Sequence, residues 1–242
     1  MGEKVFKFYQ IIRFMRMLSL FSGGKDSLYA TYLAMRDGHK IVSLLSLESK
    51  RDDSYMFHVP NISLTSFQAE ALGIPLVKRT VKGEKEKEVE ELKDIIGEFV
   101  KNREIDGIIT GAIESNYQRE RVQKIADYYG LYHYAPLWKI DSSKYMGDLI
   151  KDGIKAIIVS VSALGLDESF LGKVIDNKML EKLKKANQKY GVHLAGEGGE
   201  YETFVIDAPI FKKKIVIEKS RKKIENLNGI FLIDSVTLHD KS

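Results

Sequence analysis

The chain has 242 residues, of which 44% are hydrophobic, 30% charged and 10% aromatic. This composition is typical of a soluble globular protein, and the length predicts one large α/β domain or, as we expect, two smaller ones. The absence of cysteine excludes disulfides, cysteine zinc sites, thiol nucleophiles and a persulfide relay. A net charge of +4 is too small to predict nucleic acid as a partner.

The ends and the hydropathy of the sequence predict a cytoplasmic protein. No run of about 18 uncharged apolar residues occurs, so we expect no membrane-spanning segment. The stretch IIRFMRMLSLF near the N-terminus contains two arginines and no small-residue cleavage site, which argues against a signal peptide. Residues 1–16 are expected to form an extension outside the fold, with Met15 and Met17 as alternative starts. The abundance of Lys, Glu and Ile without Cys indicates a thermophile.

Up to about Tyr134, short β-type runs alternate with amphipathic helical runs, which predicts βαβ units and a parallel sheet. We expect five strands and four helices in this part of the chain. The strands include MLSLF (17–21), IVSLLSL (41–47), PLVKRTV (75–81) and IDGIITGAI (105–113). The helices are expected between the first strand and Gly38, at about 63–72, within 84–102, and from Ser115 to a stop at Gly130.

The loop Ser22–Ser27, SGGKDS, lies between the first strand and the first helix. Two adjacent glycines let the backbone adopt positive φ and approach a ligand, while the helix turns its free N–H groups and positive dipole end toward the loop. These features predict an anion site, to which Lys25 adds a charge. The alternative is a plain turn with Asp26 or Ser27 as the helix cap. A Walker A loop does not fit, because the earlier glycine of its pattern is missing.

The pattern changes after Pro136, and we place a boundary near residues 134–138. A helix (143–151), a strand (155–163) and a helix (176–190) are expected first, followed by antiparallel strands within 212–224 and 229–239. The prediction is therefore a parallel, doubly wound domain over 17–135 and a smaller α+β domain over 136–242. Since no low-complexity linker separates them, we expect the two domains to pack closely.

The stretch GEGGEYETF (196–204) contains Glu197, Glu200 and Glu202 around a pair of glycines. Three carboxylates within six residues repel one another, so they need a cation, a metal or solvent nearby. The alternative interpretation is an acidic surface loop.

The Ser22–Ser27 loop resembles the pyrophosphate loop of the N-type ATP pyrophosphatases, which cleave ATP between the α and β phosphates. The whole chain from Met17 onward resembles the diphthine–ammonia ligase family. Six spaced motifs carry this resemblance and make chance agreement remote. They are SYMFHVPN (54–61), GEKEKEVEELK (83–93), GAIESNYQRERV (111–122), YAPLW (134–138), SALGLDESFLGK (162–173) and GEGGEYETFVIDAP (196–209). The chain departs from the family pattern at Val59, Phe170 and Lys173, where Thr, Trp and Arg are expected.

The resemblance implies an adenine-nucleotide α-hydrolase fold with a five-stranded parallel sheet. It also implies the last step of diphthamide synthesis, in which diphthine on translation elongation factor 2 is amidated with ATP and ammonium, and AMP and pyrophosphate are released. Mg²⁺ is the expected metal, elongation factor 2 the protein partner, and a homodimer the expected assembly. A tRNA-modifying adenylase and a non-enzymatic adenine-nucleotide sensor remain open. The lack of cysteine argues against the first, and the carboxylates of 196–204 argue against the second.

The resemblance also implies roles for individual residues. The residues expected to bind ATP are Ser22, Gly23, Gly24, Lys25, Asp26, Ser27, Ser115 and Gln118, although Ser115 fits a helix cap equally well. The residues expected to bind the acceptor are Tyr201, Glu202, Gly198, Gly199, Arg119 and His58. Lys25, Asp26, Glu197 and Glu200 are expected to be catalytic, with Asp26 also a Mg²⁺ ligand. Tyr201 is expected to face the trimethylammonium group of diphthine, and a carboxylate to hold ammonium and take its proton.

Overall fold

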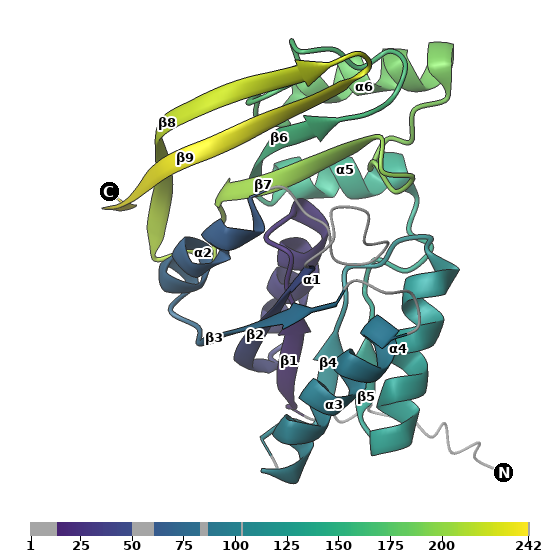
Figure 1. The fold of residues 1–242 in the computed structure, drawn as a ribbon, viewed down its shortest axis with the longest axis vertical. Helices are drawn as coiled ribbons and strands as arrows, with labels where there is room; N and C mark the ends of the chain where they lie inside the picture. Colours follow the sequence, from purple (N-terminus) through teal and green to yellow (C-terminus); the bar gives the residue numbers. More distant parts are fainter. Residues whose placement is uncertain (1–13, 50–60, 83–86, 103, 242) are drawn as a thin grey trace, which may run out of the picture.

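The computed structural model describes residues 14–49, 61–82, 87–102 and 104–241. Its N-terminal part is a five-stranded sheet in the order β3-β2-β1-β4-β5, in which every pair is parallel (Figure 1). The strands are β1 (Arg16–Leu20), β2 (Lys40–Ser49), β3 (Leu76–Val81), β4 (Gly107–Ile109) and β5 (Tyr132–Tyr134). The strand order reverses between β1 and β4, which is where ligands bind in open α/β sheets.

Helices cover both faces of this sheet because successive strand residues point to opposite sides. The helices are α1 (Lys25–Arg36), η1 (Ile62–Leu64), α2 (Thr65–Leu72), α3 (Lys87–Lys101) and α4 (Asn116–Tyr129). Met17 and Leu44 pack with α1 and α2, whereas their neighbours Leu18 and Leu45 pack with α3 and α4. Glycines in the left-handed region end α2 and α4, as the sequence predicts.

The C-terminal part adds a four-stranded antiparallel sheet in the order β7-β6-β9-β8, which lies above the parallel sheet in Figure 1. Its elements are α5 (Ser142–Lys151), β6 (Lys155–Val161), α6 (Asn177–Tyr190), β7 (Tyr201–Asp207), β8 (Lys213–Glu225) and β9 (Asn228–Asp240). The predicted fold class, a doubly wound parallel sheet with a smaller α+β unit, is confirmed. Within the described ranges, no helix is both long and apolar enough to cross a membrane.

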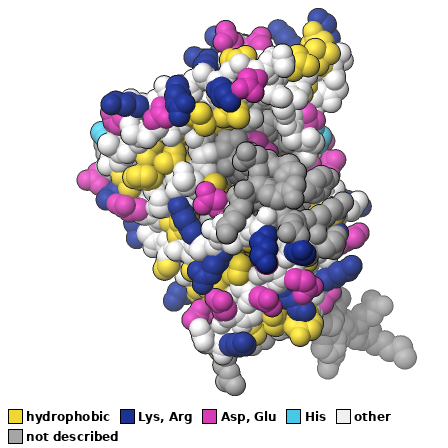
Figure 2. Space-filling view, in the orientation of Figure 1, with side chains coloured by type: hydrophobic (Ala, Val, Ile, Leu, Met, Phe, Trp, Pro, Cys, Tyr) yellow, Lys and Arg dark blue, Asp and Glu magenta, His cyan; other side chains and the backbone are white. Residues whose placement is uncertain are grey.

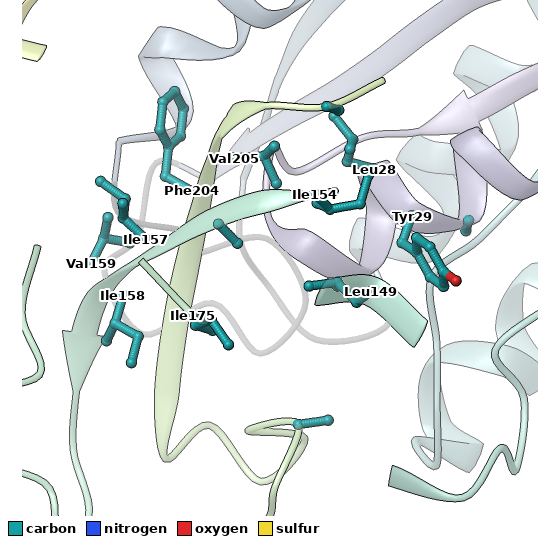
Figure 3. Close-up of a cluster of buried hydrophobic side chains, with 14 of the residues drawn as sticks. Leu28, Tyr29, Leu149, Ile154, Ile157, Ile158, Val159, Ile175, Phe204 and Val205 are labelled. Atoms are coloured by element: carbon teal, nitrogen blue, oxygen red, sulfur yellow. The ribbon is translucent and has the colours of Figure 1, made fainter. Parts of the chain in front are cut away.

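A single cluster of buried side chains joins the two parts (Figure 3). Leu28 and Tyr29 of α1 lie in it together with Leu149 of α5, Ile157 of β6 and Phe204 of β7. The parts are therefore packed through a continuous apolar core. The division into 17–135 and 136–242 stays a prediction. Most of the predicted extension 1–16 lies outside the described residues, and its last residue is the first of β1.

Charged side chains of both signs are interspersed over the face seen in Figure 2. Blue Lys and Arg groups alternate with magenta Asp and Glu groups, and neither sign forms a continuous area there. This arrangement agrees with the small net charge of the chain. Binding to the phosphate backbone of a nucleic acid would favour a basic stripe, and the described side chains on this face do not form one.

Because the core is shared, Leu149→Ala should destabilise both sheets together. The leucine side chain is fully buried, and truncation of such a residue costs about 2–5 kcal/mol. We expect far-UV circular dichroism and the fluorescence of the sole tryptophan to report one common transition at a lower temperature. Leu164→Ala is the control, because that leucine is 61% exposed and its loss should leave the midpoint unchanged. Two separate transitions in the wild type would contradict a shared core.

Candidate functional site

A cavity of about 440 Å³ lies where the strand order of the parallel sheet reverses. Its apolar lining consists of Leu20, Phe21, Leu45, Leu47, Ile62, Ala112 and Val122. Its polar lining comes from three segments and includes Ser22, Asp26, Ser27, Thr110, Gly111, Ser115, Gln118, Glu197 and Glu202. This size and this mixture of an apolar wall with a few converging polar groups are typical of sites for small molecules. The fold therefore brings the Ser22–Ser27 loop and the acidic stretch 196–204 to one cavity.

The backbone of the Ser22–Ser27 loop has the geometry of an anion site. Gly23 has a φ of +81°, and a Cβ there would lie 2.3 Å from Oε1 of Gln68. Helix α1 begins at Lys25 with Gly24 as its N-cap, and no side chain caps it. The alternative prediction of a cap by Asp26 or Ser27 is thus wrong. Apart from the Lys25 N–H, which donates to the Thr203 hydroxyl, the N–H groups of the first turn lie at the cavity end of α1, where they favour an anion.

Strand β7 and helix α2 hold the Ser22–Ser27 loop in place. The Gly23 carbonyl accepts hydrogen bonds from Val205 N at 3.0 Å and from Gln68 Nε2 at 2.8 Å. The Lys25 N–H donates to the hydroxyl of Thr203 at 3.0 Å. Since Val205 and Gln68 do not line the cavity, the Gly23 carbonyl points away from it. An oxygen that would repel a phosphate is therefore turned toward the C-terminal part.

Lys25 does not reach the cavity, contrary to its expected contact with a phosphate. Its side chain is 2% exposed, and Nζ donates to Ala195 O at 2.6 Å and to Asp26 Oδ2 at 3.0 Å. The ammonium also stands 5.2 Å from the centre of the Tyr201 ring. Lys25 thus ties the Ser22–Ser27 loop to the C-terminal part and neutralises Asp26.

Asp26 is the loop carboxylate that lines the cavity. Besides Lys25, it is oriented by the Tyr145 hydroxyl, which donates to Oδ1 at 2.7 Å. Burial, and then the nearby Asp26, raise the pKa of Tyr145 well above its usual value, so this donor stays protonated. Across the described ranges, no three His, Cys, Asp or Glu side chains are grouped as a metal site. A Mg²⁺ ion would take Asp26 and phosphate oxygens as ligands, as this ion commonly does.

Glu197 bridges the two parts of the chain at the start of α4. Its Oε1 accepts the N–H groups of Glu114 and Ser115 at 2.9 Å and that of Ile113 at 3.3 Å. Ser115 is the N-cap of α4 and accepts from Gln118 N, as predicted. In a capping box the third residue of the helix would return to the cap N–H, but here Glu197 takes that N–H. These hydrogen bonds therefore hold the Glu197 side chain at a helix N-terminus, where the helix dipole favours a carboxylate.

Glu200 does not line the cavity, although the sequence predicts a catalytic role for it. Its Oε1 accepts from His193 N at 3.0 Å. The His193 ring in turn accepts the N–H groups of Ala195 and Glu197 at Nδ1, at 3.2 and 3.3 Å. Because Nδ1 accepts, it carries no proton, and the hydrogen of the neutral ring is on Nε2. Glu200 and His193 therefore shape the turn that delivers Glu197 to the cavity.

Glu202 is the titratable carboxylate of the cavity. Burial is the main cause that raises its pKa, opposed by Lys25 and reinforced by Asp26 and Glu197, and the result is about 7. The side chain lies at the start of β7 and lines the cavity together with Asp26 and Glu197. A carboxyl group with this pKa exchanges a proton at neutral pH, which is the property of a general acid or base.

Comparison with known protein families identifies the family of the chain. The model of the diphthamide synthase N-terminal domain matches residues 15–133, and that of the diphthamide synthase C-terminal domain matches residues 141–238. The chain belongs to the diphthamide synthase family. This confirms the family that the six sequence motifs predict.

The family contains close relatives with a common name. Proteins named diphthine–ammonia ligase are 39% identical in Rattus norvegicus and 38% in Homo sapiens, each over 89% of this chain and 87% of the relative. One from Schizosaccharomyces pombe is 35% identical over 89% of this chain but 38% of its own length. A solved structure titled as a predicted subunit of tRNA methyltransferase from Methanocaldococcus jannaschii covers 80% of this chain and 97% of its own. Its TM-score of 0.41 and identity of 16% are too low for inference.

The sequence of this diphthamide synthase family member predicts further site residues, and not all of them line the cavity. Tyr201 is 1% exposed and its hydroxyl donates to Leu194 O, so its ring faces the internal Lys25 instead of a ligand. Arg119 lies over the ring of Trp138, 4.7 Å from its centre, and does not line the cavity. Gly198 and Gly199 do line it. His58 lies outside the described residues.

Several residues that build the site were not expected from sequence. Thr203 lies within the motif 196–209, but no neighbouring residue indicates that its hydroxyl accepts a hydrogen bond from the Lys25 N–H. Gly111 was also inside a motif, and its tight fit against α1 depends on strand order. Gln68 and Tyr145 carry no local signal, because each acts on a segment far away in sequence. His193 likewise carries no local signal, because its role is to accept the N–H groups of the turn before β7.

The raised pKa of Glu202 predicts how stability depends on pH. The unfolded carboxyl has a pKa of 4.5, so it loses its proton before the folded one, and stability falls as pH rises from about 4.5 to about 7. Glu202→Gln removes this loss. The variant should match the wild type at pH 4 and exceed it by on the order of 1 kcal/mol at pH 8, since partial solvation reduces the effect. Urea unfolding at both pH values measures it, with the exposed Glu120→Gln as control. A variant less stable at pH 8 would contradict the assignment.

Proposed function

We propose that the protein amidates the carboxylate of diphthine on translation elongation factor 2, using ATP and ammonium and releasing AMP and pyrophosphate. The observation that carries this proposal is the shared cavity, in which the anion-binding N-terminus of α1 meets a glutamate that titrates near neutral pH. Membership of the diphthamide synthase family and relatives named diphthine–ammonia ligase support it. Elongation factor 2 would be the protein partner.

The nucleotide would lie along the cavity, with phosphates at one end. The loop N–H groups and the hydroxyls of Ser22 and Ser27 would hold the phosphates at the start of α1. The apolar wall, which includes Leu45 and Val122, suits an adenine ring. Asp26 would hold Mg²⁺, which neutralises phosphate charge when bound.

The acidic groups suit the second half of the reaction. The acceptor carboxylate attacks the α-phosphate and displaces pyrophosphate, which leaves a carboxyl adenylate. Ammonia then attacks the adenylate carbonyl and AMP departs. Glu202 would take the proton that ammonium must lose, while Glu197 lines the same cavity and is held in place by three N–H groups. A homodimer, a cytoplasmic location and a thermophilic source stay predictions.

Nucleotide binding should be lost in Gly111→Ala. A Cβ at Gly111 would lie 2.5 Å from the backbone carbon of Asp26 and 2.7 Å from the N of Ser27, so the start of α1 must shift. We expect the affinity for ATP to fall at least tenfold in isothermal titration calorimetry. Gly147→Ala is the matched control, because no atom lies within 4 Å of a Cβ there. Equal ATP affinity in the two variants would argue against phosphate binding at α1.

The reaction itself is tested with ATP, Mg²⁺, ammonium and elongation factor 2 that carries diphthine. We expect AMP and pyrophosphate to form in step with a decrease of about one mass unit in the factor, as hydroxyl is replaced by amide. Glu202→Gln should lower kcat at least tenfold without a matching change in KM for ATP, because it removes the proton acceptor. AMP formation without the mass change would point to another acceptor. Binding of ATP without any AMP would favour a nucleotide sensor.

A further inference from the structure

A chain of hydrogen bonds runs from the surface of α4 to the wall of the cavity. Asp127, exposed on α4, accepts from Nε2 of Gln123 at 2.8 Å. Oε1 of Gln123 lies 3.1 Å from Nδ1 of His133, the middle residue of β5. Nε2 of His133 lies 2.8 Å from the hydroxyl of Thr110, which lines the cavity just after β4. Four side chains thus connect solvent with the site.

The carboxylate at the outer end sets the direction of every bond. A carboxylate accepts hydrogen bonds, so Gln123 turns its amide nitrogen to Asp127 and its amide oxygen to His133. That oxygen also accepts, so the ring hydrogen of His133 is on Nδ1. Burial, and then the charge of Arg119, lower the pKa of His133 to about 4, which keeps the ring neutral. Its bare Nε2 then accepts the hydrogen of the Thr110 hydroxyl.

The Thr110 oxygen is left with lone pairs alone. Its hydrogen is directed to His133, and among the described residues no other hydrogen bond to this oxygen occurs. Thr110 is 8% exposed, so water solvates it little. A buried acceptor without a donor is costly, and a ligand that supplies the donor is favoured over one that supplies a second acceptor.

We propose that Thr110 determines specificity by accepting a hydrogen bond from the bound ligand, and that Asp127, Gln123 and His133 position it as an acceptor. This inference rests on the proposed function, in which the ligand is a nucleotide. The donor is then either a ribose hydroxyl or the exocyclic amino group of adenine. A purely structural chain would fasten β5 to α4 and would not discriminate between nucleotides.

Calorimetric titration with ATP, inosine triphosphate, 2′-deoxy-ATP and 3′-deoxy-ATP tests the proposal. The wild type should bind one of the three analogues at least tenfold more weakly than ATP; inosine triphosphate would identify the amino group, and a deoxy analogue the ribose hydroxyl. Thr110→Val, which keeps the shape but removes the hydroxyl, should weaken ATP about tenfold and reduce the discrimination below threefold. Thr110→Ser should retain both.

A surface substitution separates positioning from packing. Asp127→Asn lets the Gln123 amide turn over, so the discrimination should fall although no cavity atom changes. Asp94→Asn, on the exposed side of α3, is the control and should behave as wild type. ATP binding with the same discrimination in Thr110→Val and Asp127→Asn would overturn the proposal and leave the proposed function standing.

The imidazole itself gives a readout that needs no nucleotide. Nitrogen-15 NMR should find His133 protonated at Nδ1 and bare at Nε2 between pH 5 and 8, and a mixture of the two tautomers in Asp127→Asn. A wild-type ring protonated at Nε2 would overturn the proposal even if ATP binds. Absence of ATP binding in the wild type, with the tautomer as expected, would overturn the proposed function and the nucleotide donor with it.

Discussion

The site depends on the contact between β7 and the Ser22–Ser27 loop, in which hydrogen bonds fix the shape of the loop. A loop with two adjacent glycines loses much conformational entropy when it becomes ordered, so its shape needs partners from outside. Val205 N and Gln68 Nε2 supply them at the Gly23 carbonyl, and the Thr203 hydroxyl supplies one at the Lys25 N–H. The N–H groups at the start of α1 are thereby pre-organised, which is how electrostatic binding of an anion becomes strong.

The same contact brings three carboxylates into one cavity, and each has a different environment there. Asp26 is paired with Lys25 and with the Tyr145 hydroxyl. Glu197 accepts three backbone N–H groups at the start of α4. Burial raises the pKa of Glu202 to about 7, although the nearby Lys25 opposes this shift. Hydrogen bonds thus hold Asp26 and Glu197 in fixed positions, while the pKa of Glu202 lies near neutral pH.

Local patterns predicted the features that depend on neighbours in sequence. Continuous apolar runs gave the parallel strands, and Gly73 and Gly130 ended their helices because glycine adopts the left-handed conformation at little cost. Ser115 caps α4 as expected, but the capping box is incomplete, since a residue from another part of the chain occupies its second hydrogen bond. The predicted contact of Lys25 with a phosphate rested on a similar local pattern, a charge beside two glycines. In the fold the side chain is buried, and its ammonium donates to Ala195 O.

The sequence by itself determined the family and the doubly wound class, because periodicity, caps and motifs act over one to three turns of chain; the anion site at the Ser22–Ser27 loop stays a prediction. Only the tertiary structure decided which polar groups face the cavity. Glu202 lies in β7 and lines the cavity, whereas Glu200 lies in the turn before this strand, where its carboxylate accepts from His193 N. The direction of the bonds from Asp127 to Thr110 also needs α4, β4 and β5 in register. In such a series of hydrogen bonds, the groups at its two ends determine which atom carries each proton, and only folding brings those groups together.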